Sequence, residues 1–254
     1  MERGSRQADR RLALQAQPIY KEMTEALRAC ATVHSDKTGW RIGLLSTWLW
    51  VFTSEKLTVY AIETSCNHEV VLDIFGKEFK GILVSDCFLA YDHQALKNWW
   101  KQKCLSHFLK DLRELTETKT RGTVRFARDV KEVLQAVLEL KIKKEQWAKA
   151  KYAKHVKILE ARLDELIDAK RKLTDPDNAR FTKRLRKHRP QILRFLYVDE
   201  LDATNNLAEL QLRPAVITRK TNGCNRTAEG VQTHAILGSV LAPVVNKPHQ
   251  FWNT

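Results

Sequence analysis

The chain has 254 residues, enough for one large domain or one domain with a sizeable insertion. Its hydrophobic content of 43% allows a sizeable core, and its net charge of +14 favours a polyanionic partner: DNA, RNA or an anionic membrane surface. No apolar run reaches the roughly 18 residues that a membrane span requires. The charged start also lacks the apolar segment of a signal peptide. These features exclude a membrane-spanning chain and predict an intracellular protein.

The first part of the chain has the pattern of a mixed sheet with covering helices. The run 47–53 is apolar and aromatic throughout, which is typical of a central strand buried on both faces. A turn follows it, and the next run returns as the second strand of a hairpin. Strands are predicted at 31–36, 47–53, 57–63 and 82–86, and helices at 67–79 and at 8–29, the latter interrupted at Pro18. The order strand, hairpin, helix, strand predicts an α/β fold.

From residue 95 to about residue 169 the pattern becomes helical. Four apolar residues recur there at spacings of three and four: Val156, Leu159, Leu163 and Leu166. Such a seam is too short to predict a dimeric coiled coil, so a helical hairpin within the chain is the simpler interpretation. The segment 175–178 (DPDN) then breaks the helical pattern.

Two clusters of basic residues follow. The segment 180–194 holds seven Lys and Arg and no acid, which fits either a solvated helix face or a face that contacts phosphates. Its candidate DNA-binding residues are Lys183, Arg184, Arg186 and Lys187. A second cluster of candidates is Arg213, Arg219, Lys220 and Arg226. The TNGCNR segment (221–226) within it offers small, flexible backbone that could approach a phosphate, or it is an ordinary loop.

Three acids at separate points of the chain are candidate metal ligands: Asp36, Asp86 and Glu209. Each also has an ordinary structural interpretation, as a turn cap, a helix N-cap and a first-turn helix acid respectively. Carboxylates from distant segments are nevertheless what a hard divalent cation such as Mg²⁺ requires. Spacing alone favours the structural roles.

The sequence around these acids matches a family pattern in six ordered stretches: 34–43, 48–62, 79–92, 102–115, 204–209 and 212–226. Together they resemble the transposases of the insertion sequence 66 family, whose catalytic domain is a DDE nuclease with a ribonuclease-H-like fold. The resemblance implies that Asp36, Asp86 and Glu209 are the catalytic and metal-binding triad. The implied cofactor is Mg²⁺ (or Mn²⁺), which would serve DNA cleavage and strand transfer.

The resemblance also implies the architecture and partners of the chain. The expected fold is a ribonuclease-H-like mixed sheet with flanking helices and a long helical insertion. The expected parts are a helical segment at 1–30, a catalytic core at 31–240 with its insertion at about 116–195, and a divergent tail at 241–254. The expected partner is double-stranded DNA, as transposon ends and target, with a homo-oligomer or a full-length transposase as a further partner. A prokaryotic cytoplasmic, nucleoid-associated location follows.

The sequence departs from the family pattern at several points. Lys37 replaces the Glu of the first motif, and Leu210 replaces the Arg of the third. The chain begins just before the catalytic core, so the expectation is an incomplete copy without autonomous transposition. Two alternatives stay open: a non-catalytic DNA-binding remnant, and a protein whose helical insertion mediates assembly.

The five cysteines are scattered and include no CxxC pair, which predicts a reduced compartment and no zinc ribbon. Cys104 and His107 have the only metal-like spacing. A packed helix face explains this spacing better than a zinc site. The family resemblance places the pair near the active-site side of the fold, as a supporting feature at most.

Overall fold

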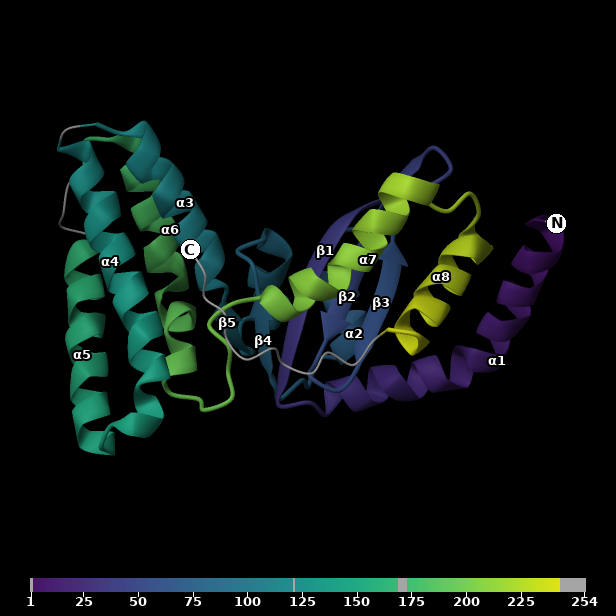
Figure 1. Ribbon diagram of the computed structural model, residues 1–254, viewed down its shortest axis with the longest axis horizontal. Coiled ribbons are helices and arrows are strands. Elements are labelled where there is room, and N and C mark those ends of the chain that lie inside the picture. Colours follow the sequence, from purple (N-terminus) through teal and green to yellow (C-terminus); the bar gives the residue numbers. More distant parts are fainter. Residues whose placement is uncertain (1, 121, 169–172, 243–254) are drawn as a thin grey trace. The chain divides into compact units, whose positions relative to one another are not determined.

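The computed structural model describes residues 2–120, 122–168 and 173–242 (Figure 1). The chain forms two compact units. The sheet unit comprises Met1–Lys101 and Asn205–Thr254, and the helical unit comprises Gln102–Thr204. Of the tail expected at 241–254, residues 243–254 lie outside the described residues.

The sheet unit is built on a five-stranded mixed sheet in the order β3-β2-β1-β4-β5 (Figure 1). The strands are β1 (Thr32–Ile42), β2 (Leu45–Thr53), β3 (Thr58–Glu63), β4 (Ile82–Ser85) and β5 (Trp100–Lys103). The first three form an antiparallel meander, and β4 pairs with β1 in parallel. The predicted α/β class and the predicted hairpin are thereby confirmed.

Alternation along β1 divides the sheet into two buried faces. Val33 packs with Trp50 and Phe52 on one face. Trp40 packs with Leu49 and Val51 on the other face, beneath helix α7 (Asn206–Asn222). Side chains of β1 at even positions, including Asp36, therefore point toward α7. Strand β1 is longer than the predicted 31–36 because its second half pairs with β2 as far as Ile42, and the turn follows at Gly43 with φ 58°.

Four helices flank the sheet: α1 (Glu2–Arg28), α2 (His68–Phe75), α7 and α8 (Ala228–Val240). Helix α1 runs through Pro18 without ending, so the predicted interruption there is wrong. Proline removes one backbone donor from the helix and favours a kink. Here buried side chains anchor the helix on both sides of the proline: Ala13 and Ala16 pack against Ile236 of α8, and Leu27 enters the core beneath the sheet.

The helical unit contains α3 (Leu105–Thr118), α4 (Thr123–Ile142), α5 (Lys149–Leu166) and α6 (Pro176–Ile192). Short 3₁₀ turns complete the chain at Leu89–Asp92, Gln94–Leu96, Lys144–Gln146 and Arg194–Leu196. Three of the four predicted seam residues (Val156, Leu163 and Leu166) are buried. Strand β5 corrects the prediction that the chain is helical from residue 95, because a four-residue polar segment has no helical or strand periodicity to reveal it.

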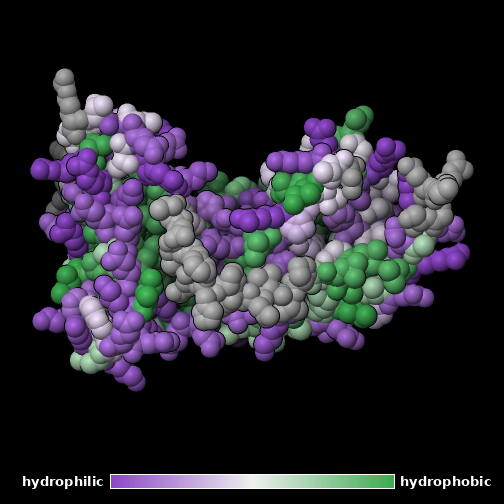
Figure 2. Space-filling model, viewed as in Figure 1, coloured by the Kyte–Doolittle hydropathy of each residue, from purple (hydrophilic) through white to green (hydrophobic). Residues whose placement is uncertain are grey.

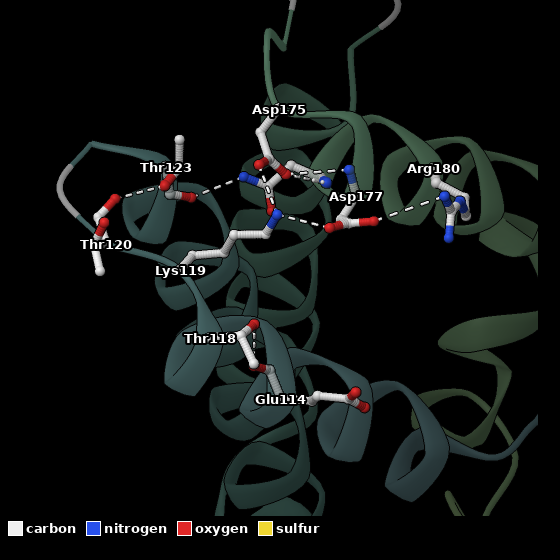
Figure 3. Close-up of polar contacts among 9 residues, drawn as sticks. Glu114, Thr118, Lys119, Thr120, Thr123, Asp175, Asp177 and Arg180 are labelled. Carbon is white, nitrogen blue, oxygen red and sulfur yellow. Dashed lines mark hydrogen bonds and ion pairs between the residues drawn. The ribbon is translucent and has the colours of Figure 1, made fainter.

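The start of α6 explains why DPDN breaks the preceding pattern (Figure 3). Asp175 caps the helix by accepting hydrogen bonds from the backbone N–H groups of Asp177 and Asn178. The Lys119 ammonium bridges the carboxylates of Asp175 and Asp177 at 2.7 and 2.6 Å. Asn178 adds a 2.8 Å hydrogen bond from its Nδ2 to the carbonyl oxygen of Thr123. These contacts join the first turn of α6 to the ends of α3 and α4.

The helical unit begins and ends at neighbouring points. The N–H of Leu105 donates a 2.9 Å hydrogen bond to the carbonyl oxygen of Ala203. Close by, Gln102 donates from its Nε2 to Ile192 and accepts from the N–H of Phe195. The two ends of this unit are thus held together by its own hydrogen bonds. No helix among the described residues has the length and apolar character that crossing a membrane would need.

Candidate active site

Asp36 lies in the middle of β1, on the sheet face that α7 covers. Its partner in β2 is Val51, so the backbone around it is held on one side by the antiparallel ladder. Its Oδ1 accepts a 2.8 Å hydrogen bond from the N–H of Lys37. A short carboxylate in the interior of a paired strand has little freedom to move, which suits a residue that must hold a fixed position.

Asp86 follows β4 directly. The parallel register pairs Val84 with His34, and Asp86 and Asp36 each lie two residues further along their strands. The side chains of the two acids therefore lie at the same level, one on β1 and the other directly after β4. Asp86 also accepts a 2.9 Å hydrogen bond from the N–H of Phe88, so it holds the turn after the strand as well.

Glu209 comes to this edge from 123 residues further along the chain because α7 is anchored to β1 at its first residues. Asn205 donates a 2.9 Å hydrogen bond from Nδ2 to the carbonyl oxygen of Ser35, next to Asp36. The carbonyl of Asn205 accepts the N–H of Glu209, which lies in the first turn of the helix. Ala208 and Leu212 then pack onto the sheet. The TNN motif that precedes Glu209 is therefore a structural anchor.

The charges of Asp86 and Glu209 act on Asp36. Burial is the largest cause that raises the pKa of Asp36, and the negative charges of Asp86 and Glu209 raise it further, to about 6. The N–H and the positive charge of Lys37 oppose this increase. Within the sheet unit, Asp86 and Glu209 thus lie near enough to Asp36 for their charges to act on it.

Two residues that sequence reasoning missed support this edge from the other face of the sheet. Tyr91 is fully buried, and its hydroxyl lies 2.9 Å from Oγ of Ser35. Burial and the charges of Asp86 and Asp36 raise the pKa of Tyr91 well above its ordinary value. Its place in the family-like stretch 79–92, five residues after Asp86, was a usable signal, whereas Ser35 gave none because a serine in a strand is unremarkable.

Lys37, the residue that departs from the family pattern, points away from the Asp36 side chain. As an odd-numbered residue of β1 it lies on the face of Trp50 and Tyr91. Its ammonium lies 3.3 Å from the ring centroid of Phe88 and within 6 Å of the Trp50 and Tyr91 rings. This cation–π contact joins β1 to the turn that carries Asp86.

Of the predicted DNA-binding residues of α6, at least Arg184 and Arg186 make contacts within the helical unit. Arg184 pairs with Asp111, and Arg186 donates to the carbonyl oxygens of Ile167 and Asp168. Lys183 and Lys187 are exposed. Two of the four candidates are therefore engaged in holding the helical unit together.

The second predicted cluster lies in the sheet unit. Arg219 of α7 donates to Oγ1 of Thr38 at 3.0 Å and to the carbonyl oxygen of Gly39, so it ties α7 to β1. The other three candidates are exposed: Arg213, Lys220 and Arg226.

The TNGCNR segment also has a structural role. Asn225 accepts from the Trp40 indole at 2.8 Å, and its carbonyl accepts from the N–H of Gly43. The segment is thereby attached to the turn between β1 and β2.

The cysteines are free thiols. Cys104 is fully buried directly before α3, with its Sγ 2.9 Å from Oγ of Ser106. Elsewhere in the helical unit, a pocket of about 330 Å³ lies between α3 and α6. Its lining mixes acidic, basic and apolar groups: Asp111, Glu114, Leu115, Thr118, Asp177, Arg180, Phe181 and Arg184. This pocket contains none of the three acids.

An antiparallel meander continued by a parallel strand, with helices on both sides, defines a ribonuclease-H-like fold. Residues 6–233 match the sequence model of the Transposase IS66 family. The chain belongs to this family. Among solved structures, the chain is similar to the catalytic core domain of the HTLV-2 integrase, solved in complex with magnesium in a dimeric form. The identity is 13% and the TM-score 0.24, over 38% of this chain and 81% of that chain. No curated protein matches the chain.

Proposed function

We propose that this chain is a DDE transposase catalytic domain that cleaves DNA strands and transfers them to a target. Asp36, Asp86 and Glu209 would be its metal ligands. The observation that carries the proposal is the convergence of three acids: Asp36 and Asp86 lie at the same level of neighbouring strands, and Glu209 lies in the first turn of a helix anchored beside Asp36. The raised pKa of the largely buried Asp36 agrees with this arrangement. Buried like charges are costly unless a cation neutralises them, and sites that retain such a cost are more often functional than structural.

The donor set fits a divalent cation. Three carboxylates offer the hard oxygen ligands that Mg²⁺ or Mn²⁺ prefers, and they leave room for water and phosphate oxygens. Bound there, such an ion would supply Lewis-acid stabilisation of the attacking and leaving oxygens in a phosphodiester displacement. The ion is proposed as Mg²⁺ or Mn²⁺.

The chain's own residues would fix the geometry of the reaction. Asp36 is held in a strand interior, Asp86 by the N–H of Phe88, and Glu209 in the first turn of an anchored helix. The positive charge of Lys37 keeps Asp36 more ionised than burial alone would allow. Exposed basic residues such as Arg213, Lys220 and Arg226 are proposed to hold DNA phosphates near this edge.

The proposed partner is double-stranded DNA, as transposon ends and as target. A homo-oligomer or a full-length transposase is proposed as a further partner. Base-specific recognition requires side chains that read base edges, usually from a helix in the major groove.

Nicking of a supercoiled plasmid tests the proposal. Asp86→Asn keeps an oxygen that can accept from Phe88, so the fold should persist while metal-dependent nicking falls by more than about 100-fold, beyond the effect of removing a supporting residue. Asp73→Asn is the matched control, because Asp73 is an exposed acid of the same unit on α2. Nicking by Asp86→Asn at the wild-type rate would refute the assignment.

A second candidate function is that of a DNA-binding remnant without turnover. It is favoured by Lys37, whose positive charge stands where the family pattern has a carboxylate. This reading expects salt-sensitive DNA binding but no nicking with Mg²⁺ or Mn²⁺. Metal-dependent nicking by the wild-type chain that Asp86→Asn abolishes would exclude it.

A further inference from the structure

The turn between α4 and α5 gathers lysines at one end of the helical unit. Between Lys141 and Lys157 the sequence has seven lysines and a single acid, Glu145. Two of the seven have internal partners. Lys141 donates to three backbone carbonyl oxygens, and Lys144 pairs with Asp199.

The other five lysines are exposed. Across residues 2–120, 122–168 and 173–242, no carboxylate lies within ion-pair distance of any of them. These five lysines are Lys143, Lys149, Lys151, Lys154 and Lys157. We call the surface that they form with Trp147 the lysine hairpin. Unlike Arg184 and Arg189 of α6, these lysines form no ion pair with the described residues of their unit.

Three members of the lysine hairpin form a stripe on α5. Lys151, Lys154 and Lys157 recur every three residues, opposite the buried residues Tyr152 and Val156. At 1.5 Å per residue the stripe is about 9 Å long. Duplex DNA carries one charge per roughly 1.7 Å of axis, so about five phosphate charges fall within that length.

Trp147 organises the base of this stripe. The ammonium of Lys151 lies 4.2 Å from the centroid of its ring, and His155 packs against it at 4.7 Å in an edge contact. The ring thereby holds one lysine in place, which reduces the entropy lost when that lysine binds a fixed phosphate.

The lysines of this end of the helical unit also act on a nearby acid. The pKa of Asp199 is lowered by Lys144 above all and also by Lys141 and Lys149, although its side chain is largely exposed. Figure 2 shows hydrophilic residues spread over the helical unit on the face that it presents. An anionic ligand would meet these lysines without displacing a carboxylate of the described residues from any of them.

The chemistry of the surface selects among anionic partners. A membrane-surface helix needs a free apolar face, but the residues that form the apolar face of α5 are buried: Tyr152, Val156 and Leu163. Single-stranded nucleic acid is bound on several aromatic platforms, and here there is one tryptophan whose ring Lys151 already covers. A row of ammonium groups at helical spacing fits the regular phosphates of a duplex.

We infer that the lysine hairpin binds the phosphate backbone of double-stranded DNA without reading its sequence. The identity of the partner rests on the proposed function, whereas the surface itself is separate from the three acids. Lysine acts there as a point charge on a flexible stem, which suits contacts that position a duplex rather than specify a base.

The test uses the full chain, a 30-base-pair duplex and no divalent metal, so that binding is measured apart from cleavage. In one variant the five hairpin lysines become Gln. In the control variant five exposed lysines of the sheet unit become Gln, which removes the same charge: Lys21, Lys56, Lys77, Lys80 and Lys97. Both variants are first checked for an unchanged melting temperature.

In a plot of the logarithm of the binding constant against the logarithm of the salt concentration, the slope of the hairpin variant should be shallower by about 0.9 for each lysine that neutralises a phosphate. Its affinity for the duplex should fall on the order of tenfold or more. The control variant should change much less. Lys151, Lys154 and Lys157 of the wild-type chain should also resist acetylation when the duplex is present.

Equal losses in the two variants would show a diffuse charge effect and overturn the inference. So would unchanged binding by the hairpin variant, or hairpin-dependent binding to phosphatidylserine vesicles but not to the duplex. Duplex binding that needs the hairpin, in a chain that does not nick DNA, would support the inference and refute only the proposed catalysis.

Discussion

The two units of this protein use charge in opposite ways. The helical unit holds 26 of the 44 Lys and Arg and 16 of the 30 Asp and Glu, and so carries +10 of the net charge of +14. The sheet unit is close to neutral, yet it concentrates three carboxylates at one edge. Net charge therefore indicates which unit attracts a polyanion, whereas the arrangement of a few acids indicates where chemistry could occur.

Within the helical unit, two basic segments also use their charges differently. The most basic helix by sequence, α6, directs Arg184 and Arg189 to acids of α3 and α5. The α4–α5 turn, which has a less conspicuous sequence, keeps five of its seven lysines in solvent. A dense basic segment is thus a poor guide to a binding face when acids lie on the neighbouring helices.

The largest expected effect tests whether the units are energetically distinct. Trp50 is fully buried in the sheet unit, so Trp50→Ala should lower the free energy of unfolding by about 3–5 kcal/mol. Hydrogen exchange should show lost protection in the sheet unit and retained protection in Gln102–Thr204. Leu134→Ala, a matched truncation in the helical core, should give the reverse pattern at about 2–5 kcal/mol. Loss of protection in both units from either change would mean one cooperative domain.

The next effect concerns the cost of the acid cluster. Since the native pKa of Asp36 is about 6, the native state binds a proton that the unfolded chain releases near pH 4. Stability should therefore fall as pH rises through this window. Asp36→Asn removes the buried charge, so the free energy of unfolding at pH 7 should rise by about 2–3 kcal/mol. Urea unfolding should show this gain shrinking toward pH 4, and a gain that is independent of pH would contradict the cause.

An acid of the helical unit should show the opposite sign. The Lys119 ammonium and the backbone N–H of Asn178 lower the pKa of Asp175, so its stabilising effect is present at neutral pH and is lost as pH falls below its ordinary range. Asp175→Ala removes a helix cap and should cost about 1 kcal/mol at pH 7. The same urea series measures it. Asp177→Ala, which leaves the cap in place, should cost less.

The smallest effect concerns Lys37. Lys37→Met keeps the length of the side chain and removes its charge, and loss of the cation–π contact with Phe88 should cost about 0.5–1 kcal/mol. Because the Lys37 charge lowers the pKa of Asp36, the variant should raise that pKa further. An NMR titration of the Asp36 carboxyl carbon measures the shift. An unchanged titration would mean that the lysine serves only to hold the turn after β4.

The sequence predicts those parts of the fold that depend on local periodicity. The strands at 47–53 and 57–63 and the helix after residue 67 are apolar at the expected spacing, and they were found with small errors at their ends. Strand β5 and the uninterrupted α1 depend on pairing and packing with distant residues, which no local pattern records. Tertiary contacts override propensity in both cases.

The candidate site divides in the same way. The three acids were found through the sequence motifs around them. The contacts that hold their strands and helix in place could not be predicted from the sequence. The Asn205 contact with Ser35 joins residues 170 positions apart, and the Tyr91 contact with Ser35 crosses the sheet edge. The internal partners of Arg184 and Arg186 were equally invisible, since an arginine has the same sequence pattern whether it faces an acid or water.

The hydrogen bond between Leu105 and Ala203 has an evolutionary consequence. A segment whose two ends meet can be inserted, lengthened or exchanged at one point of a host fold without stretching the chain on either side. The helices between Leu105 and Ala203 can thus vary as one segment. The positions of the three acids in the sheet unit depend instead on strand register and on the anchor at the start of α7. Related chains can therefore vary the helices of this segment while the sheet unit and its three acids keep their arrangement.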